Sequence, residues 1–364
     1  MRAAMGKPNR ISGVVAFVVV ALLVSAGCGG SPPLRYFSSE TGPVRGGNYR
    51  CVAVADFNCD GLLDIVAGSF DPGGIEIWLG NGDGSWTQAE GPTKVGFTWS
   101  VAAGDCNGDG RPDIISASRG DLLGVHVWYS MPDGTWVEGP QPVRAGLFDG
   151  LLTADFNKDG NLDIAATSES TLGATGGVVV WIGDGRGNWS ESQAPESMNI
   201  FRDVATADFN GDGILDLAAT CWGVNGGVKV WYGDGRGGWF AGKCPDLKGS
   251  FWGIAASDFN RDGLPDIVAG TYSHGLYLWY GDRQKIWRGP VRLSKSGGFM
   301  GVAPGDFNGD GRVDIVASSM TNLGLRIWLN GENGWEERIE GSPSQPNYFG
   351  LATGDFNRDG LTDI

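Results

Sequence analysis

One ten-residue frame, repeated along the chain, constrains the fold more than any other sequence feature. In every copy position 1 is Asp, position 3 Asn, position 5 Asp, position 6 Gly and position 9 Asp, and successive copies start 49, 50, 53, 50, 48 and 49 residues apart. A period of about 50 residues is typical of repeat proteins, in which each unit buries its apolar surface against the next. The seven frames start at Asp56, Asp105, Asp155, Asp208, Asp258, Asp306 and Asp355.

The polar side chains of the frame have the spacing of a calcium-binding loop. Ca²⁺ takes roughly six to eight oxygen ligands, and alternate residues of a tight loop turn their oxygens toward one point. Positions 1, 5 and 9 offer carboxylates, position 3 an amide oxygen and position 7 a backbone carbonyl. We therefore predict up to seven Ca²⁺ ions, bound by Asp56, Asn58, Asp60, Leu62, Asp64, Asp105, Asn107, Asp109, Arg111, Asp113, Asp155, Asn157, Asp159, Asn161, Asp163, Asp208, Asn210, Asp212, Ile214, Asp216, Asp258, Asn260, Asp262, Leu264, Asp266, Asp306, Asn308, Asp310, Arg312, Asp314, Asp355, Asn357, Asp359, Leu361 and Asp363.

The loop differs from an EF-hand in two ways. Position 12, where an EF-hand carries a bidentate Glu, is Ala or Ser in the six repeats that extend so far. The flanking segments, V-A-V-A before Asp56 and D-I-V-A-G from Asp64, have strand composition rather than helix composition. The alternative is an Asp/Asn/Gly-rich turn without metal. We consider this alternative weaker, because it leaves the repeated Asp at position 9 unexplained.

Each repeat contains four strand-like runs. The first leads into the loop, as at residues 101–103, the second leaves it, as at 113–116, the third is of the type at 227–232, and the fourth starts at a Trp. Short strands separated by glycine turns, without helical periodicity, predict an all-β protein, and specifically a β-propeller. Seven frames predict seven blades of four antiparallel strands over residues 51–364. The seventh blade is predicted to be incomplete, because the chain stops at Ile364, as a truncated gene or a fragment would.

Two tryptophans recur in register in six repeats, one on the third strand and one at the start of the fourth. Recurrence in every repeat favours a packing role between neighbouring sheets over stacking on carbohydrate. The pairs are Trp78/Trp86, Trp128/Trp136, Trp181/Trp189, Trp231/Trp239, Trp279/Trp287 and Trp328/Trp335.

These features resemble the FG-GAP (VCBS-type) repeat family, the module of the integrin α-subunit propeller. The resemblance extends from Tyr36 to the end of the chain. It rests on the D-x-N-x-D-G-x-x-D loop, on the Phe349-Gly350 pair with its variant at 251–253, and on the Ala-Gly-Ser or Ala-Ser-Ser run after the second strand. The resemblance implies Ca²⁺ in the loops between strands one and two, on the lower face of the propeller.

The N-terminus has the features of an export signal. Three basic residues (Arg2, Lys7 and Arg10) precede an apolar run over 11–24, and Ser25-Ala26-Gly27 leads to Cys28. This ending resembles a bacterial lipobox, which implies a signal peptide at 1–27, a lipid on Cys28 and a place in the bacterial cell envelope. A plain secretory signal and an uncleaved anchor are the alternatives. Residues 28–50 are predicted to be a tether that contains a possible closing strand.

The charge of the chain argues against nucleic-acid binding. The net charge is −15, and removal of the three basic residues of the signal makes it −18. The loops contribute 21 of the 42 acidic residues, and seven Ca²⁺ ions would bring −18 to −4. A polyanionic partner would be repelled.

Positions that break the repeat pattern are the candidates for ligand binding. The position six residues before each loop lies on the first strand, toward the upper face, and combines charged and aromatic side chains that suit a sugar. The alternative is that this ring packs internally, with Asp149 and Arg202 pairing across adjacent blades. The predicted ring is Arg50, Trp99, Asp149, Arg202, Trp252, Met300 and Phe349. The loops between strands two and three on the same face hold Trp222, Tyr272 and His274.

No catalytic motif is present in the sequence: it has no nucleophile elbow, HExxH or phosphate-binding loop. We therefore predict a non-catalytic protein that binds a glycan or an extracellular or envelope protein. One alternative is a polysaccharide lyase or another sugar-modifying enzyme, which needs Arg50, Asp149, Arg202 or His274 around one substrate. A purely structural array is the other.

Three smaller patterns have simple interpretations. Arg119-Gly120-Asp121 spells an adhesion tripeptide, which chance explains in a chain this rich in Gly and Asp. His126 is expected to be an ordinary exposed strand residue. Apart from Cys28, five cysteines remain, and Cys221 with Cys244, which fall in one repeat, is the favoured disulfide.

Overall fold

The computed structural model describes residues 48–142, 146–169, 176–193, 195–283, 286–321, 323–340 and 349–364. The predicted signal peptide, Cys28 and nearly all of the predicted tether lie outside these residues. Asn48, Tyr49 and Arg50, assigned to the tether from the sequence, begin the first strand. Within the described ranges no helix has both the length and the apolar character needed to span a bilayer.

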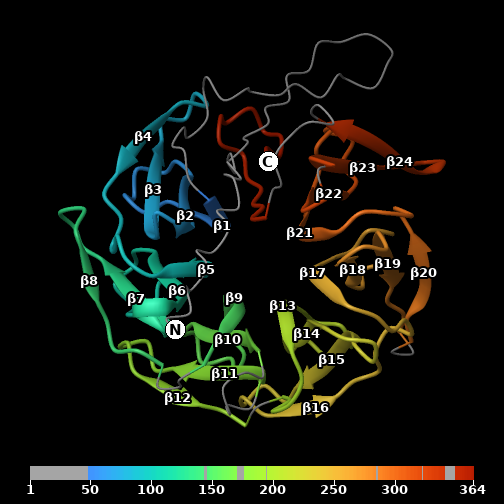
Figure 1. Ribbon diagram of the computed structural model, residues 1–364, viewed down its shortest axis with the longest axis horizontal. Coiled ribbons are helices and arrows are strands. Elements are labelled where there is room, and N and C mark those ends of the chain that lie inside the picture. Colours follow the sequence, from blue (N-terminus) through green and yellow to red (C-terminus); the bar gives the residue numbers. More distant parts are fainter. Residues whose placement is uncertain are drawn as a thin grey trace, which may run out of the picture.

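Six antiparallel sheets of four strands each stand around a common axis, with the first strand of each sheet innermost (Figure 1). Strand order within each sheet follows the sequence, so each blade is a simple meander. The strands are β1 (Asn48–Ala55), β2 (Asp64–Asp71), β3 (Gly74–Gly80) and β4 (Trp86–Ala89) in blade 1; β5 (Phe97–Gly104), β6 (Asp113–Arg119), β7 (Gly124–Ser130) and β8 (Trp136–Glu138) in blade 2; β9 (Phe148–Ala154), β10 (Asp163–Ser168), β11 (Gly177–Gly183) and β12 (Trp189–Glu191) in blade 3; β13 (Phe201–Ala207), β14 (Asp216–Cys221), β15 (Gly227–Gly233) and β16 (Trp239–Ala241) in blade 4; β17 (Phe251–Ser257), β18 (Asp266–Thr271), β19 (Leu276–Tyr280) and β20 (Arg288–Arg292) in blade 5; and β21 (Phe299–Gly305), β22 (Asp314–Ser319), β23 (Leu325–Gly331) and β24 (Gly334–Glu340) in blade 6.

The prediction of seven blades is wrong: the described residues form six. Residues 349–364, which carry the seventh loop, lie between β21 and β1 and contain only the isolated bridge between Gly354 and Asp363 (Figure 1). Their side chains still fill the space, since Phe356 packs edge-on to Trp86 of blade 1 at 5.4 Å between ring centroids. On the other side Ile364 joins the core of blade 6. A sheet needs several paired strands, and no second, third or fourth strand accompanies the seventh loop in the described residues, so counting loops overestimates the blades.

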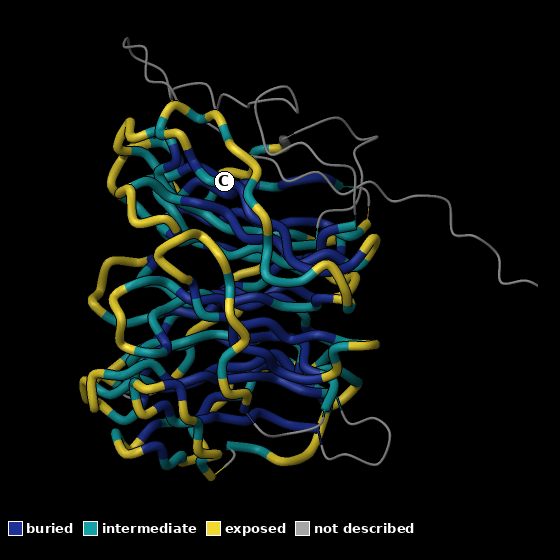
Figure 2. The backbone as a smooth tube through the Cα atoms, turned by 90° about the vertical axis from the view of Figure 1, so that its left-hand side faces the viewer, coloured by how far each residue is buried: buried dark blue, intermediate teal, exposed yellow. Residues whose placement is uncertain are grey.

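The second and third strands of the blades are largely buried, because neighbouring blades cover both of their faces. Residues Asp163–Ser168 are all buried, whereas the fourth strands of blades 2 to 4 have exposed residues. Figure 2 shows buried segments through the interior and exposed turns at the edges. Small side chains such as Ala165 and Ala166 allow the sheets to approach closely, and both are fully buried.

The paired tryptophans pack between neighbouring blades, as predicted. Trp181 of blade 3 is 1% exposed and lies in one cluster with Val127 of blade 2. The tryptophan that starts the fourth strand contacts the preceding blade: Trp239 packs edge-on to Phe156, the second residue of the blade 3 loop, at 5.4 Å. These contacts join consecutive repeats, so the aromatic pattern stabilises the order of the blades.

Candidate functional site

The repeated loops are built from side-chain oxygens that accept backbone N–H groups of the same turn. In blade 3, Asp155 accepts hydrogen bonds from the N–H of Asp159 at 3.1 Å and of Gly160 at 2.8 Å. Asn157 Oδ1 accepts from Asp159 N–H at 3.0 Å, and Asp159 Oδ1 accepts from Asn161 N–H at 2.8 Å. The side chains at positions 1, 3 and 5 therefore fold over one turn.

The Asp at position 9 has a structural function that the sequence did not reveal. In blade 3, Asp163 is fully buried, and its two oxygens accept the N–H of Phe156 at 2.8 Å and of Gly183 at 2.9 Å. It thus joins the loop to the end of the third strand. Burial raises the pKa of Asp163 to about 6. The same pair of contacts, to the loop and to the third strand, is made by Asp64, Asp113, Asp216, Asp266 and Asp314.

In the seventh loop the Asp at position 9 accepts the hydrogen bond from the loop but not the one from a third strand. Asp363 Oδ2 accepts the N–H of Phe356 at 3.0 Å, but Asp363 Oδ1 is buried and has no hydrogen-bond partner among the described residues. In the six blades this oxygen receives the third-strand N–H. In the six blades, hydrogen bonds account for the Asp at position 9 without a metal ion, so our argument that a metal-free turn leaves this residue unexplained is wrong there.

The loops fit Ca²⁺ in the kind of donor they offer. Positions 1, 3 and 5 are hard oxygen donors, and a carboxylate oxygen that accepts one N–H keeps a further lone pair. The carboxylate at position 9 also accepts one backbone N–H on each oxygen, but it is fully buried, whereas positions 1, 3 and 5 lie at the exposed turn. In the part of the chain that the structure describes, no three His, Cys, Asp or Glu side chains come together as a metal site.

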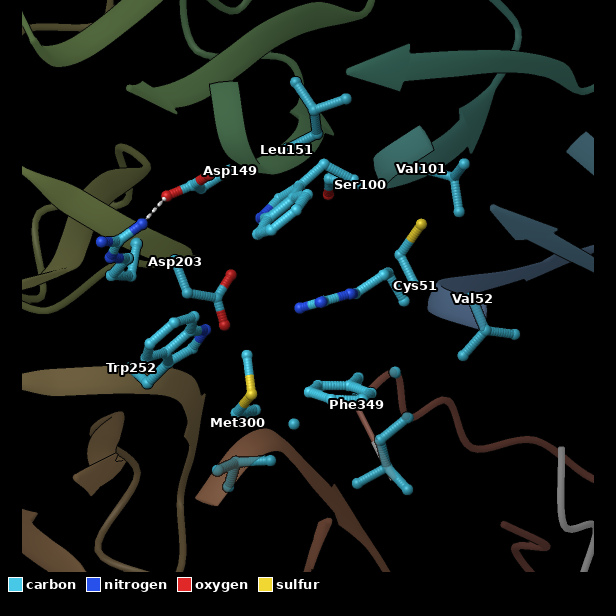
Figure 3. A pocket seen from close by; sticks show the side chains of 17 residues that line it. Cys51, Val52, Ser100, Val101, Asp149, Leu151, Asp203, Trp252, Met300 and Phe349 are labelled. Atoms are coloured by element: carbon cyan, nitrogen blue, oxygen red, sulfur yellow. Dashed lines mark hydrogen bonds and ion pairs between the residues drawn. The ribbon is translucent and has the colours of Figure 1, made fainter. Parts of the chain in front are cut away.

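The seven predicted ring residues do come together, at the end of the first strands opposite the loops. Arg50, Trp99, Asp149, Arg202, Trp252, Met300 and Phe349 all line one cavity of ≈ 230 Å³, which we call the central pocket. Figure 3 shows Asp149, Asp203, Trp252, Met300 and Phe349 around a common space. Of the residues considered for an enzyme, His274 does not line it.

One side of the central pocket holds a partly buried ion-pair cluster around the buried Asp149. Asp149 binds the guanidinium groups of both Arg119 and Arg202, the latter at 2.6 Å. Glu169 also pairs with Arg202 and lies 3.6 Å from Arg119. The predicted alternative, pairing of Asp149 with Arg202 across adjacent blades, is confirmed. Burial raises the pKa of Asp149 to about 6, while the two arginines oppose the shift.

Aromatic rings surround this cluster. The guanidinium of Arg119 lies over Trp99 at 3.9 Å, and that of Arg202 lies over Trp252 at 4.8 Å. Trp222 contacts Trp252 edge-on at 5.4 Å between centroids. Such cation–π contacts stabilise guanidinium groups that are partly removed from water. The arginine of the adhesion tripeptide is thus engaged inside the protein, which agrees with chance as the origin of that motif.

Arg50 lies on the other side of the pocket. Its guanidinium packs over Trp99 at 4.5 Å, Phe349 at 4.4 Å and Phe70 at 5.1 Å. Its Nε is buried without a hydrogen-bond partner among the described residues. Burial, and next the nearby charge of Arg119, lower the pKa of Arg50.

Sequence reasoning missed Asp203, Arg119 and Glu169. Asp203 lies five residues before its loop, where four of the other six repeats have Gly, and this break in the pattern was the available signal. Arg119 and Glu169 each lie six residues after the ninth-position Asp. They belong to a second variable ring around the first: Phe70, Arg119, Glu169, Trp222, Tyr272 and Met320.

Asp203 is held by backbone N–H groups of two blades. One oxygen accepts from Val204 at 2.9 Å and the other from Ile254 of blade 5 at 3.1 Å. Burial raises the pKa of Asp203 to about 7; the two N–H groups oppose this shift, and the charge of Asp149 adds to it. Asp203 is therefore the carboxyl group of the pocket that titrates near neutral pH.

Two further predictions from the sequence are wrong. His126 is buried rather than exposed: it stacks on Trp128, and its Nδ1 lies 3.2 Å from Glu138 Oε1. Cys221 and Cys244 are both free, the first buried and the second exposed. Cys51 lines the central pocket, and burial raises its pKa to about 12, so its thiol is unreactive at neutral pH.

Replacement of Asp203 by Asn is expected to change how stability depends on pH. The pKa of Asp in an unfolded chain is about 3.9, so between about pH 4 and 7 Asp203 is protonated in the folded protein and ionised in the unfolded one. This difference stabilises the folded protein, and the stabilisation is lost as pH rises through about 7. Wild type should therefore lose on the order of 2 kcal/mol more than Asp203→Asn between pH 5 and 8. Urea unfolding of both proteins, in EGTA, measures the difference; parallel curves would contradict the assignment.

Comparison with known proteins gives the family of the chain. Among solved structures, the lectin BP39L from Burkholderia pseudomallei has a TM-score of 0.65 at 19% identity and covers 87% of this chain and 89% of its own. BBS1N, in complex with ARL6DN, has a TM-score of 0.59 at 12% identity and covers 90% of each chain. At such low identity these likenesses concern the fold alone. No curated protein sequence matches the chain.

The sequence itself matches the family described as FG-GAP-like repeat in five overlapping segments. These segments are residues 56–116, 105–166, 155–219, 208–269 and 258–317. Each begins at the first Asp of one loop and ends past the next loop, so the match follows the repeat unit. Together with a ring of four-stranded blades, this shows that the chain belongs to the FG-GAP-like repeat family.

Proposed function

We propose that the protein is a non-catalytic binding protein whose central pocket holds a sugar residue of a glycan. The observation that carries this proposal is the meeting of seven variable positions, six on first strands and the seventh at Phe349, in a single cavity. In a repeat protein, the positions that recur build the scaffold, and those that vary are free to serve a ligand. The fold similarity to a lectin supports the same class of function.

The size and lining of the central pocket suit one sugar ring. Its ≈ 230 Å³ is below the roughly 300–1,000 Å³ of typical sites for drug-sized ligands, so it accommodates a single ring while the rest of a glycan stays outside. Trp99 and Trp252 line it with indole groups, and Arg50, Asp149 and Arg202 supply polar groups for hydroxyls. A flat apolar ring beside fixed charges is the combination that orients a sugar.

The second candidate function is that of an enzyme, a polysaccharide lyase or another sugar-modifying enzyme. One residue of the central pocket supports it. Asp203, with its pKa raised to about 7, is suited to proton transfer at neutral pH. However, both of its oxygens already accept backbone N–H groups. Among the described residues that line the pocket there is no His, Lys or Tyr, and the other carboxyl group, Asp149, is held by Arg119 and Arg202. Analysis of products from any glycan that binds distinguishes an enzyme from a lectin.

Replacement of Trp252 by Ala should weaken glycan binding by about tenfold or more, because the truncation removes an aromatic wall of the central pocket. Binding is measured on a broad glycan array and quantified by calorimetry on the best ligands. Phe240→Ala is the matched control, since this exposed aromatic residue lies on β16 at the outer edge of blade 4. Equal binding by a folded Trp252→Ala protein would contradict the pocket. Failure of the wild type to bind any glycan would favour a protein partner, as in the complex of BBS1N with ARL6DN.

We also propose that the exposed oxygens of the loops bind Ca²⁺ and that binding stabilises the propeller. The loops place carboxylates of positions 1 and 5 and an amide oxygen of position 3 over one turn, as in Asp155, Asn157 and Asp159. The fully buried Asp at position 9 is assigned to the scaffold in this proposal. A cation would also reduce the repulsion between neighbouring carboxylates.

Two matched substitutions in one loop separate these roles. Asp155→Asn removes a carboxylate of the ion site and should reduce the stabilisation by Ca²⁺, with a small effect in EGTA. Asp163→Asn leaves a buried backbone N–H facing the NH₂ group of the new amide. This substitution should therefore lower the free energy of unfolding by about 1–3 kcal/mol in EGTA as well as in Ca²⁺. Thermal unfolding of both variants and of wild type, with Ca²⁺ and with EGTA, measures this. If wild type melts at the same temperature in both buffers, the calcium proposal fails.

We propose further that the protein is exported and attached to the bacterial cell envelope by a lipid on Cys28. This proposal rests on the basic, apolar and small-residue segments of the first 28 residues. Labelling with radioactive palmitate in a bacterial host should mark the wild type and not Cys28→Ser. Label retained by Cys28→Ser would contradict the proposal.

A further inference from the structure

The three arginines of the central pocket and its surroundings differ in their counter-ions. Arg119 and Arg202 both pair with Asp149, and both lie near Glu169. Arg50 makes no ion pair with any described residue, and its Nε has no hydrogen-bond partner among them. Three guanidinium groups thus face two carboxylates, which leaves one positive charge unmatched beside the cavity.

Three aromatic rings lie close to the guanidinium group of Arg50. Trp99 and Phe349 lie 4.5 and 4.4 Å from its central carbon, and Phe70 lies at 5.1 Å. A guanidinium donates its hydrogen bonds in its own plane, at the edges that stacking leaves free. Because Arg50 lines the cavity, a ligand there can reach these donors.

Asp203 lines the same cavity but makes no ion pair with Arg50, and it carries only part of a negative charge at pH 7. Its two oxygens accept the N–H groups of Val204 and Ile254. Burial raises its pKa to about 7, so a substantial share of the carboxyl groups is neutral at pH 7. Burial likewise lowers the pKa of Arg50, and the nearby charge of Arg119 lowers it further, because both make the positive charge of Arg50 unfavourable in the free protein.

We infer that the central pocket selects a sugar with a carboxylate, a uronic acid residue of an acidic glycan, and that Arg50 binds this carboxylate through two parallel hydrogen bonds. This inference rests on the proposed glycan-binding function. One unmatched positive charge fits a monoanion and does not fit a phosphate dianion, and the planar guanidinium edge matches a planar carboxylate. A sulfate ester is also a monoanion, so the test includes it.

The test compares oligosaccharides that differ only in their charged group. The full-length protein is titrated in a calorimeter with oligogalacturonate, its methyl ester, a neutral galactose oligosaccharide and a sulfated galactose oligosaccharide, and with the corresponding glucuronate and mannuronate series. We expect at least one uronate to bind roughly 10- to 100-fold more tightly than its methyl ester, because charged bidentate hydrogen bonds have about this strength. This comparison needs no variant, so it does not depend on whether a mutant folds.

Variants of Arg50 then assign the preference to one side chain. Arg50→Gln should abolish the difference between acid and ester, and Arg50→Lys should keep part of it, since lysine retains the charge and loses the paired donors. Arg288→Gln is the control: this arginine lies on β20 at the outer edge of blade 5, and its side chain is 72% exposed. It should bind as wild type does.

The outcomes separate the inference from the proposed function. Equal binding of acid, ester and neutral sugars would overturn the carboxylate inference and leave the glycan-binding proposal standing. Tighter binding of the sulfated sugar than of every uronate would overturn the carboxylate assignment. A preference for uronates that persists in a folded Arg50→Gln protein would overturn the role of Arg50. No binding to any sugar would overturn the proposed function itself.

Discussion

The interaction on which the blades depend is the pair of hydrogen bonds made by the buried Asp at position 9 of the loop in each of the six blades. One oxygen accepts an N–H of the loop and the other an N–H near the end of the third strand, as Asp163 does with Phe156 and Gly183. A fully buried carboxylate is costly unless both of its oxygens have partners. Here they do, so the loop between strands one and two is tied to strand three.

The blades then join through apolar contacts between consecutive repeats. Trp181 packs in a cluster with residues of blade 2, and Trp239 packs on the loop of blade 3. These contacts place the first strands around one axis, with their early residues at the upper face. A pocket at that face follows from the architecture, because residues that are about 50 positions apart in sequence become neighbours. Its chemistry depends on which side chains occupy the variable positions.

The central pocket is asymmetric because the variable positions differ in charge and in shape. On one side, Asp149 and Glu169 neutralise Arg119 and Arg202. On the other, Arg50 packs against aromatic rings and has no carboxylate partner among the described residues. The pocket therefore combines a half whose charges are paired across neighbouring blades with a half in which the guanidinium of Arg50 is surrounded by aromatic rings.

The sequence alone determined the repeat unit, the strand content, the order of strands within a blade and the seven ring positions, because each follows from a short pattern that recurs in register. Only the tertiary structure decided the number of blades, since a sheet requires paired strands and residues 349–364 form a single bridge. It also decided the role of Asp163 and its counterparts, the pairing of Asp149, and the position of Asp203 in the pocket. These depend on contacts between strands or between blades, which are distant in sequence and are brought together by the ring.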